Sequence, residues 1–252
     1  MSDKSGSEHA TNAKQLIIGH RGAAGEAPEN TLASFRLALE QGADAIELDI
    51  HETADGELIV CHDHTVDRTT DGSGFIEQLT MEELRRLDAG SWFDERFAGE
   101  RLPLLADVLA LTPPGIMINV EIKCGYSARL SGELQRLLKE YDRLATVVVS
   151  SFGHKTLHRL KRDIPELRIG LLYVGGFVHH ARLAELSDME VYSLHPHYLS
   201  MDAEDVAQAV SAGLQVYPYT VNDPVHLTRA VEAGFSGIIT DYPARLREIL
   251  QR

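Results

Sequence analysis

The sequence has few cysteines and no long hydrophobic run, and each absence excludes a class of protein. Only Cys61 and Cys124 are present, which is too few for a disulfide framework and indicates a reducing compartment. No apolar run reaches the roughly 18 residues of a membrane-spanning helix. The polar N-terminus, residues 1–14, lacks the apolar core of a signal peptide. We therefore expect a cytoplasmic location and no membrane insertion.

The sequence also has no run of Lys or Arg. Its 38 acidic residues outnumber 24 basic ones, which gives a net charge of -14. Nucleic-acid binders normally present a basic face, so we exclude that class of partner. An anionic substrate would meet an unfavourable long-range field, which local cations and a metal ion would have to overcome. We expect a small-molecule substrate, and the sequence leaves a homodimer open.

Predicted strands alternate with predicted helices after the polar tail at residues 1–14, which we expect to be disordered. The 252 residues are 44% hydrophobic and 25% charged, an ordinary globular composition, and their number suits one α/β barrel. Strands are predicted at 16–19, 45–50, 58–62, 116–122, 146–150, 168–172, 191–194, 215–219 and 237–239. Helices are predicted at 31–41, 81–87, 105–111, 128–141, 154–162, 181–186, 203–212, 224–233 and 243–250. This alternation indicates βαβ units and a parallel sheet.

A weak internal repeat supports a barrel. Residues 40–49, 211–220 and 232–241 each contain a helix end, a glycine, a short apolar strand and a polar residue. Eight such units are present if 58–62 is an extra strand. We therefore predict an α/β protein with one domain, a (β/α)8 TIM barrel at residues 15–252. The chemistry of such barrels lies at the carboxyl ends of the strands.

One stretch, residues 63–104, interrupts the alternation after the second strand. It is polar, contains one short predicted helix and is too long for a simple loop. We interpret it as a small insertion over one edge of the barrel mouth. Trp92 and Phe93 are its expected anchors, because aromatic side chains dominate such packing. The alternative is that both are ordinary core residues of the insertion.

Three acidic residues near strand ends form a candidate metal site. Glu47 and Asp49 are two residues apart on one strand, so their side chains point to the same side, and Glu121 lies on a neighbouring strand. Carboxylates suit hard cations, so we expect Mg²⁺ or Ca²⁺, with Mn²⁺ as a third candidate. The alternative is buried ion pairs with Arg21 and Lys123. Three acids in a dry barrel mouth would repel one another without a cation, which favours the metal.

Two histidines that end predicted strands are candidates for a general acid and a general base. Imidazole titrates near neutral pH, and His20 and His62 both stand beside charged residues. The alternatives are a buried core histidine or a metal ligand. Next to them, Arg21 offers a planar donor fork to a phosphate, and Lys123 adds a point charge.

Several further residues have weaker signals. Glu29 and Asn30 follow the His20 loop and are candidate substrate-binding residues, although Asn30 or Thr31 is alternatively the cap of the first helix. His195 and His197 are interpreted as parts of a rim loop that shapes the pocket, with a pair of metal ligands as the alternative. The other histidines are predicted to lie on the surface: His51, His64, His154, His158, His179, His180 and His226.

Eight short motifs occur in order over about nine tenths of the chain. They are His20-Arg-Gly22, Pro28-Glu-Asn-Thr31, Glu47-Leu-Asp49, His62-Asp63 with Arg68-Thr-Thr70, the segment from Leu84 to Phe93, Glu121-Ile-Lys123, Thr220-Val-Asn222 and Gly237-Ile-Ile-Thr-Asp241. Each motif is weak alone, but the ordered set is highly specific. It resembles the glycerophosphodiester phosphodiesterase family.

The resemblance implies a (β/α)8 barrel with a small insertion after the second strand. It also implies a metal-dependent enzyme of lipid and glycerol metabolism that hydrolyses glycerophosphodiesters to sn-glycerol 3-phosphate and an alcohol. The residues that it assigns are a divalent-cation site at Glu47, Asp49 and Glu121, catalytic histidines at His20 and His62, and phosphate binding at Arg21 and Lys123.

Two positions depart from the family pattern. Tyr219 stands where Trp often precedes Thr-Val-Asn, and Leu104 stands where Thr is common; both concern pocket shape rather than chemistry.

Two alternative functions are a related lyase of the sphingomyelinase D type, which acts on lipid head groups, and a non-catalytic phosphate-binding barrel. The insertion favours the hydrolase over the lyase, and the intact residue set argues against a non-catalytic protein. The residues do not decide which histidine is the acid, or whether water or a glycerol hydroxyl is the nucleophile.

Overall fold

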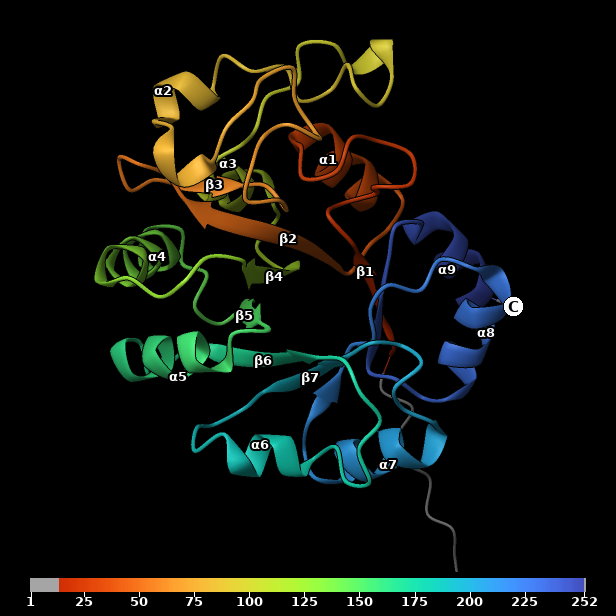
Figure 1. Cartoon of the computed structure of the whole chain (residues 1–252). Helices are drawn as coiled ribbons and strands as arrows, with labels where there is room; N and C mark the ends of the chain where they lie inside the picture. The colour runs from red at the N-terminus through yellow and green to blue at the C-terminus, as the bar shows by residue number, and fades with distance from the viewer. Residues whose placement is uncertain (1–13, 252) are drawn as a thin grey trace, which may run out of the picture.

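Eight parallel strands form a nearly closed barrel in the computed structural model, which describes residues 14–251 (Figure 1). The barrel strands are β1 (Leu16–Gly19), β2 (Ala45–Glu52), β4 (Met117–Ile122), β5 (Val147–Ser151), β6 (Arg168–Tyr173), β7 (Ser193–Pro196), β8 (Gln215–Val216) and β9 (Gly237–Thr240). The outer helices are α1 (Leu32–Glu40), α3 (Leu105–Leu111), α4 (Ala128–Glu140), α5 (His154–Asp163), α6 (Arg182–Leu186), α7 (Ala203–Ser211), α8 (Pro224–Glu232) and α9 (Pro243–Leu250). The predicted (β/α)8 TIM barrel is confirmed. The predicted disordered tail, residues 1–14, lies outside the described residues except for Lys14.

The parallel strands follow the order β8-β7-β6-β5-β4-β2-β1-β9, so the first strand lies between the second and the last. At the seam between β8 and β9, the backbone N–H of Val221 donates to the Ile239 carbonyl (2.9 Å) and the N–H of Ile239 donates to the Pro218 carbonyl (3.0 Å). This order brings the carboxyl ends of all the parallel strands to one end of the barrel.

Each barrel strand is apolar because one face lies inside the barrel and the other packs against helices. On β2, Ile46, Leu48 and Ile50 belong to the main hydrophobic core, while the alternate residues Glu47 and Asp49 face the inside of the barrel. Helix α1 begins after Thr31, whose Oγ1 accepts the N–H of Ser34 (3.3 Å), so Thr31 rather than Asn30 is the cap. Within residues 14–251, no helix has both the length and the hydrophobicity needed to cross a membrane.

A ninth strand within the described part of the chain, β3 (Leu58–Val60), pairs antiparallel with β2 and lies off the barrel path. This confirms the predicted extra strand. The insertion follows, residues 63–104, and contains three short helices, η1 (Ile76–Gln78), α2 (Met81–Leu84) and η2 (Glu95–Phe97). In Figure 1 its yellow and orange segments lie to one side of the barrel, beyond β3 and α1. Helix α2 is shorter than predicted, since it ends at Leu84 rather than at residue 87.

An aliphatic cluster, rather than aromatic residues, anchors the insertion. The buried members of this cluster are Ile59, Cys61, Val66, Ile76, Met81, Leu84, Ala89 and Leu102. The predicted anchor role of Trp92 is wrong, because this side chain is 40% exposed. Its indole N–H donates to the Ala89 carbonyl (2.9 Å), and its ring contacts Phe93 edge-on, so these contacts stay within the insertion.

Strand β7 lies two residues further along the chain than predicted, and this changes the interpretation of His195. The residue lies inside the barrel, fully buried, instead of on a rim loop, and its Nε2 is 2.8 Å from the Ser193 hydroxyl. Burial lowers the pKa of His195 to about 3. The predicted surface location of His51 and His180 is also wrong, because both side chains are buried.

Acid is expected to destabilise the protein through His195. In the unfolded chain a histidine titrates near 6.5, so this residue stabilises the fold fully above about pH 6.5, and the contribution is lost as the pH falls toward 3. At about pH 5 the expected loss is about 2 kcal/mol in the free energy of unfolding. His195→Gln should therefore show a smaller loss than the wild type between about pH 7.5 and pH 5 in urea denaturation. The exposed control His179→Gln should behave as the wild type, and an undiminished loss in His195→Gln would contradict the assignment.

Candidate active site

Three carboxylates converge at the carboxyl ends of two neighbouring strands. Glu47 and Asp49 occupy alternate positions of β2, and Glu121 on β4 is directly in register with Asp49. All three side chains are buried, and one oxygen of each lies within 4.8 Å of the others. The arrangement follows from the two-residue period of a strand and the parallel register of its neighbour.

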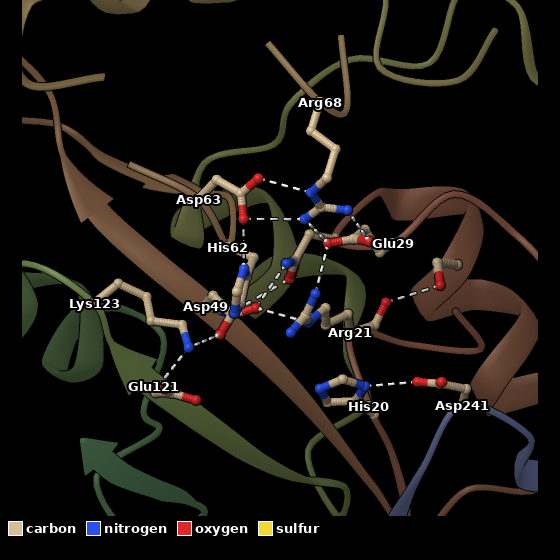
Figure 2. A network of polar contacts seen from close by, with 12 residues as sticks. His20, Arg21, Glu29, Asp49, His62, Asp63, Arg68, Glu121, Lys123 and Asp241 are labelled. Carbon is tan, nitrogen blue, oxygen red and sulfur yellow. Dashed lines mark hydrogen bonds and ion pairs between the residues drawn. The ribbon is translucent and has the colours of Figure 1, made fainter. Parts of the chain in front are cut away.

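Two basic side chains lie against the carboxylate cluster. Asp49 forms an ion pair with each of them: Arg21 Nε lies 3.2 Å from Oδ2, and Lys123 Nζ lies 3.3 Å from Oδ1. Lys123 Nζ also lies 2.6 Å from Glu121 Oε1, as Figure 2 shows. The ion pairs that the sequence offered as an alternative are therefore present. When all three carboxylates are ionised, the cluster carries one more negative charge than the two basic groups neutralise.

The pKa values of the three carboxylates reflect both their burial and the excess of negative charge. Burial raises the pKa of Glu121 to about 7, and the charge of Asp49 adds to this effect. Burial and the same neighbouring charges raise the pKa of Glu47 well above its usual range. Burial also acts on Asp49, but Arg21 and Lys123 outweigh it and lower the pKa of that carboxyl. Two of the three carboxylates are therefore hard to ionise without further positive charge.

These residues fit a hard divalent cation. Asp49 Oδ1 is buried and accepts no hydrogen bond from any residue between 14 and 251. The donor set consists only of carboxylate oxygens, which Mg²⁺, Ca²⁺ and Mn²⁺ prefer. A doubly charged cation would also offset the burial and the neighbouring negative charge that raise the pKa values of Glu47 and Glu121.

His20 follows the end of β1 and is held by a carboxylate from the other end of the chain. Its Nδ1 lies 2.6 Å from Asp241 Oδ1, directly after β9. Asn222 fixes that carboxylate in turn, because its Nδ2 donates to Asp241 Oδ2 (2.5 Å) and its Oδ1 accepts the Asp241 N–H (2.9 Å). Because Nδ1 shares its proton with Asp241, Nε2 is the nitrogen that is free to accept or donate a proton.

His62 has the same arrangement with a different partner. Its Nδ1 lies 2.7 Å from Oδ1 of the adjacent Asp63, and Arg68 holds both oxygens of Asp63 at 2.7 and 3.2 Å. Burial lowers the pKa of His62, and the positive charges of Arg21 and Lys123 act in the same direction. Arg68 and the His62 contact hold the pKa of Asp63 well below its usual range.

The supporting carboxylates were not predicted as site residues. Asp63 and Asp241 both occur in the ordered motifs, and each directly follows a strand-end segment, which is the signal that the sequence offered. Arg68 occurs in the same motifs, and Asn222 follows β8. The sequence does not show that Asp241 and Asp63 hold the two histidines, or that Asn222 and Arg68 hold these two carboxylates in turn.

The loop after β1 positions Arg21 through its own backbone and through Glu29. The Arg21 N–H donates to Glu47 Oε2 (2.9 Å), and Nη1 donates to Glu29 Oε1 (2.8 Å). Arg68 grips both oxygens of Glu29 at 2.8 Å, so Glu29 joins this loop to the insertion (Figure 2). The next residue, Gly22, has φ +89°, and a Cβ there would lie 2.4 Å from the Ser34 hydroxyl, so the turn requires glycine.

Asn30 is buried directly behind the carboxylate cluster. Its Nδ2 donates to Asp49 Oδ2 (2.8 Å), and its Oδ1 accepts the Asp49 N–H (3.3 Å). The backbone of Asn30 has φ +58°, a left-handed conformation that Asn tolerates better than most residues. The two hydrogen bonds fix the position of Asp49 from the side of α1.

The structure thus brings all nine predicted site residues into one region, on β2 and β4 and on the loops that follow β1, β3 and β4. Figure 2 labels all of them except Glu47 and Asn30. The arrangement combines a carboxylate cluster, two basic groups and two histidines whose Nδ1 atoms are held by carboxylates. Such a set can bind a phosphate through positive charge and can move protons on either side of it.

Comparisons with known proteins agree with this chemistry. The model of the glycerophosphoryl diester phosphodiesterase family matches residues 20–245. A glycerophosphodiester phosphodiesterase of Caldanaerobacter subterraneus is 43% identical over 242 residues, which cover 95% of this chain and 99% of that protein. A glycerophosphodiester phosphodiesterase of Bacillus subtilis is 33% identical over 246 residues, covering 90% of this chain and 84% of the relative.

Solved structures show the same architecture. An Oleispira antarctica phosphodiesterase in complex with the product sn-glycerol-3-phosphate has a TM-score of 0.87 at 31% identity, with 95% of this chain and 98% of that chain covered. A putative glycerophosphoryl diester phosphodiesterase from Silicibacter pomeroyi has a TM-score of 0.86 at 27% identity, with 95% and 94% covered.

Proposed function

The chain belongs to the glycerophosphodiester phosphodiesterase family, and from this premise we propose that it hydrolyses glycerophosphodiesters to sn-glycerol 3-phosphate and an alcohol with the help of a divalent cation. The observation that carries the proposal is the pair of carboxylate-supported histidines beside the three-carboxylate cluster. A cytoplasmic location and a homodimer stay predictions.

Glu47, Asp49 and Glu121 are proposed to hold the cation, which supplies Lewis acidity at a phosphate oxygen when bound. Arg21 and Lys123 already lie against this cluster, so they are placed to neutralise the remaining phosphate charge. Arg21 suits this role because its planar guanidinium can donate to two oxygens at once.

Glu29 and Asn30 are proposed to act through their neighbours rather than by direct contact with substrate. Glu29 uses both oxygens on Arg21 and Arg68, and Asn30 uses both side-chain polar atoms on Asp49. Together they orient one phosphate-binding group and one metal ligand. This assignment refines the substrate-binding role that the sequence suggested for them.

His20 and His62 are proposed to carry the proton transfers. One imidazole takes a proton from the attacking hydroxyl as its oxygen bonds to phosphorus, and the other gives a proton to the alcohol oxygen as its bond to phosphorus breaks. Asp241 and Asp63 keep each Nδ1 occupied, so the chemistry falls to the two Nε2 atoms. The attacking hydroxyl belongs either to water or to the substrate glycerol, which would form a cyclic phosphate first.

Product analysis tests the proposal. We expect the protein, supplied with Mg²⁺, Ca²⁺ or Mn²⁺, to convert glycerophosphocholine and glycerophosphoethanolamine to sn-glycerol 3-phosphate and the free alcohol. Phosphorus NMR distinguishes this product from a cyclic phosphate or an unchanged diester. A cyclic phosphate as the end product would identify a lyase of the sphingomyelinase D type, and no turnover with any of the three cations would favour a non-catalytic barrel.

A further inference from the structure

His62 lies on a segment, residues 61–64, that leaves the sheet after β3. That strand ends at Val60, so the backbone of His62 lies beyond the regular pairing of β3 with β2. Asp63 holds the imidazole at Nδ1, but Asp63 is itself the next residue of this segment. On the side of β1, Arg68 joins Asp63 to Glu29. The distance of His62 from the carboxylate cluster on β2 therefore depends on the bonds that tie the segment to that strand.

Two hydrogen bonds tie the segment to β2, one on either side of His62. Ahead of His62, the Cys61 N–H donates to the Asp49 carbonyl (3.0 Å). Behind it, the His51 imidazole lies with Nε2 at 3.1 Å from the His62 carbonyl oxygen. Because a carbonyl can only accept, Nε2 is the nitrogen that carries the proton of this contact. Both bonds come from the strand that also carries the clustered carboxylates.

The two-residue period that places the cluster also places His51. Glu47, Asp49 and His51 occupy alternate positions of β2, so their side chains leave the strand on the same side. The backbone of His51 is in register with Ile59 of β3, the strand that leads to His62. The His51 side chain is buried, with 3% of its surface exposed. A buried imidazole N–H requires an acceptor, and the His62 carbonyl supplies one.

The exposed ring of His64 packs against His51 without sharing its hydrogen bond. The two ring centroids are 4.9 Å apart in an edge-on arrangement. The His64 carbonyl accepts the N–H of Ile76 in η1 (2.9 Å), so this histidine faces the insertion. Removing the His64 ring changes the packing of His51 and leaves the bond to His62 in place, which makes His64 a matched control.

Small displacements of His62 are expected to lower turnover strongly. Its imidazole lies beside Asp49 (Figure 2), whose negative charge acts against burial in setting the pKa of His62. Proton transfer requires a donor and an acceptor within hydrogen-bond distance. A misplacement of about 1 Å can cost about 100-fold in rate. A bond that fixes the His62 backbone therefore has an effect on catalysis that exceeds its effect on stability.

We propose that His51 is a positioning residue, whose bond to the His62 carbonyl holds His62 at the distance from the carboxylate cluster at which its imidazole can transfer a proton. The inference rests on the proposed function and adds a residue to it. His51 acts through His62 and takes no part in the proton transfer itself.

Two amide variants test the proposal. His51→Gln places an amide nitrogen at the position of Nε2 and can still donate to the His62 carbonyl, whereas His51→Asn places it at the position of Nδ1, which does not reach. For glycerophosphocholine, kcat should fall about 10- to 100-fold in His51→Asn and stay within about threefold of the wild type in His51→Gln. KM and the Kd of the cation, measured by calorimetry, should change less than about threefold in both variants. His64→Ala should keep wild-type turnover.

A double-mutant cycle shows whether His51 acts through His62. His62→Ala removes the imidazole but keeps the carbonyl, so in that background His51→Asn should lower the residual kcat less than about twofold. A loss as large as in the wild-type background would mean that His51 acts on another group, and the inference would fail. It would also fail if His51→Asn kept full turnover, or if His51→Gln lost as much as His51→Asn.

Two further outcomes are kept apart from these. A cation Kd that rises together with the loss of kcat would show that His51 acts through Asp49, two residues away on β2, and would overturn the inference. If the wild type hydrolyses no glycerophosphocholine with any of the three cations, the proposed function fails. Crystal structures of the wild type and of His51→Asn then decide the inference, because a displaced His62 backbone supports it and an unchanged one overturns it.

Discussion

His20→Ala and His62→Ala are each expected to lower kcat by about 10²–10⁴-fold, because each removes a group that transfers a proton in the transition state. The two Nε2 atoms are proposed to face one bound phosphate, and each imidazole is held at Nδ1 by its own carboxylate. Steady-state turnover of glycerophosphocholine measures the effect. Circular dichroism and calorimetric cation binding should be close to the wild type, since neither histidine belongs to the carboxylate cluster.

Graded and matched variants separate catalysis from packing. Asp241→Asn keeps the shape of the His20 partner but removes its charge, so we expect a smaller loss of kcat and an altered pH profile. The exposed histidine variant His179→Ala should keep full turnover. If His20→Ala or His62→Ala retained near wild-type turnover, that histidine would be a packing residue only.

Exhaustive chelation is expected to abolish turnover, with a loss of about 10³-fold or more, and added divalent cation should restore it. The reason is the buried surplus of negative charge formed by Glu47, Asp49 and Glu121 beside only two basic groups. Full activity after treatment with EDTA and passage through a chelating resin would contradict metal dependence.

Substitutions within the cluster should weaken cation binding and turnover together. Asp49→Asn is expected to have the strongest effect, because Asp49 contacts both basic groups and has one oxygen without a hydrogen-bond donor among the described residues. Glu52→Gln is the matched control on the same strand, since the Glu52 side chain bonds to Ser127 and Arg129 outside the cluster. Calorimetric titration with Mg²⁺, Ca²⁺ and Mn²⁺ also ranks the three cations.

Much of the barrel could be predicted from the sequence, because its signals are local. Apolar runs bounded by polar residues mark the strands, and the two-residue period of β2 places Glu47 and Asp49 on one face. The parallel architecture then brings Glu121 beside them. The extra strand β3 was found for the same reason, as an apolar run that does not fit the repeat of the barrel units.

The features that escaped prediction depend on contacts that are distant in sequence or on exact register. Asp241 meets His20 across 221 residues, and no local pattern marks that pair. A shift of two residues in β7 decided whether His195 lies in a rim loop or inside the barrel. The large aromatic ring of Trp92 favours an anchoring role, whereas the insertion is held by small contributions from many aliphatic residues.

The contact between His20 and Asp241 has a consequence for the synthesis of the protein. A ribosome makes the loop after β1 early, but the partner of its histidine emerges only after the other barrel strands have been made. Until then the first strand lacks β9 on one side, and closing so long a loop is slow compared with forming local helices. The nascent chain therefore holds its three clustered carboxylates before it holds both of its supported histidines. It acquires the complete set of candidate site residues only after β9 has been made.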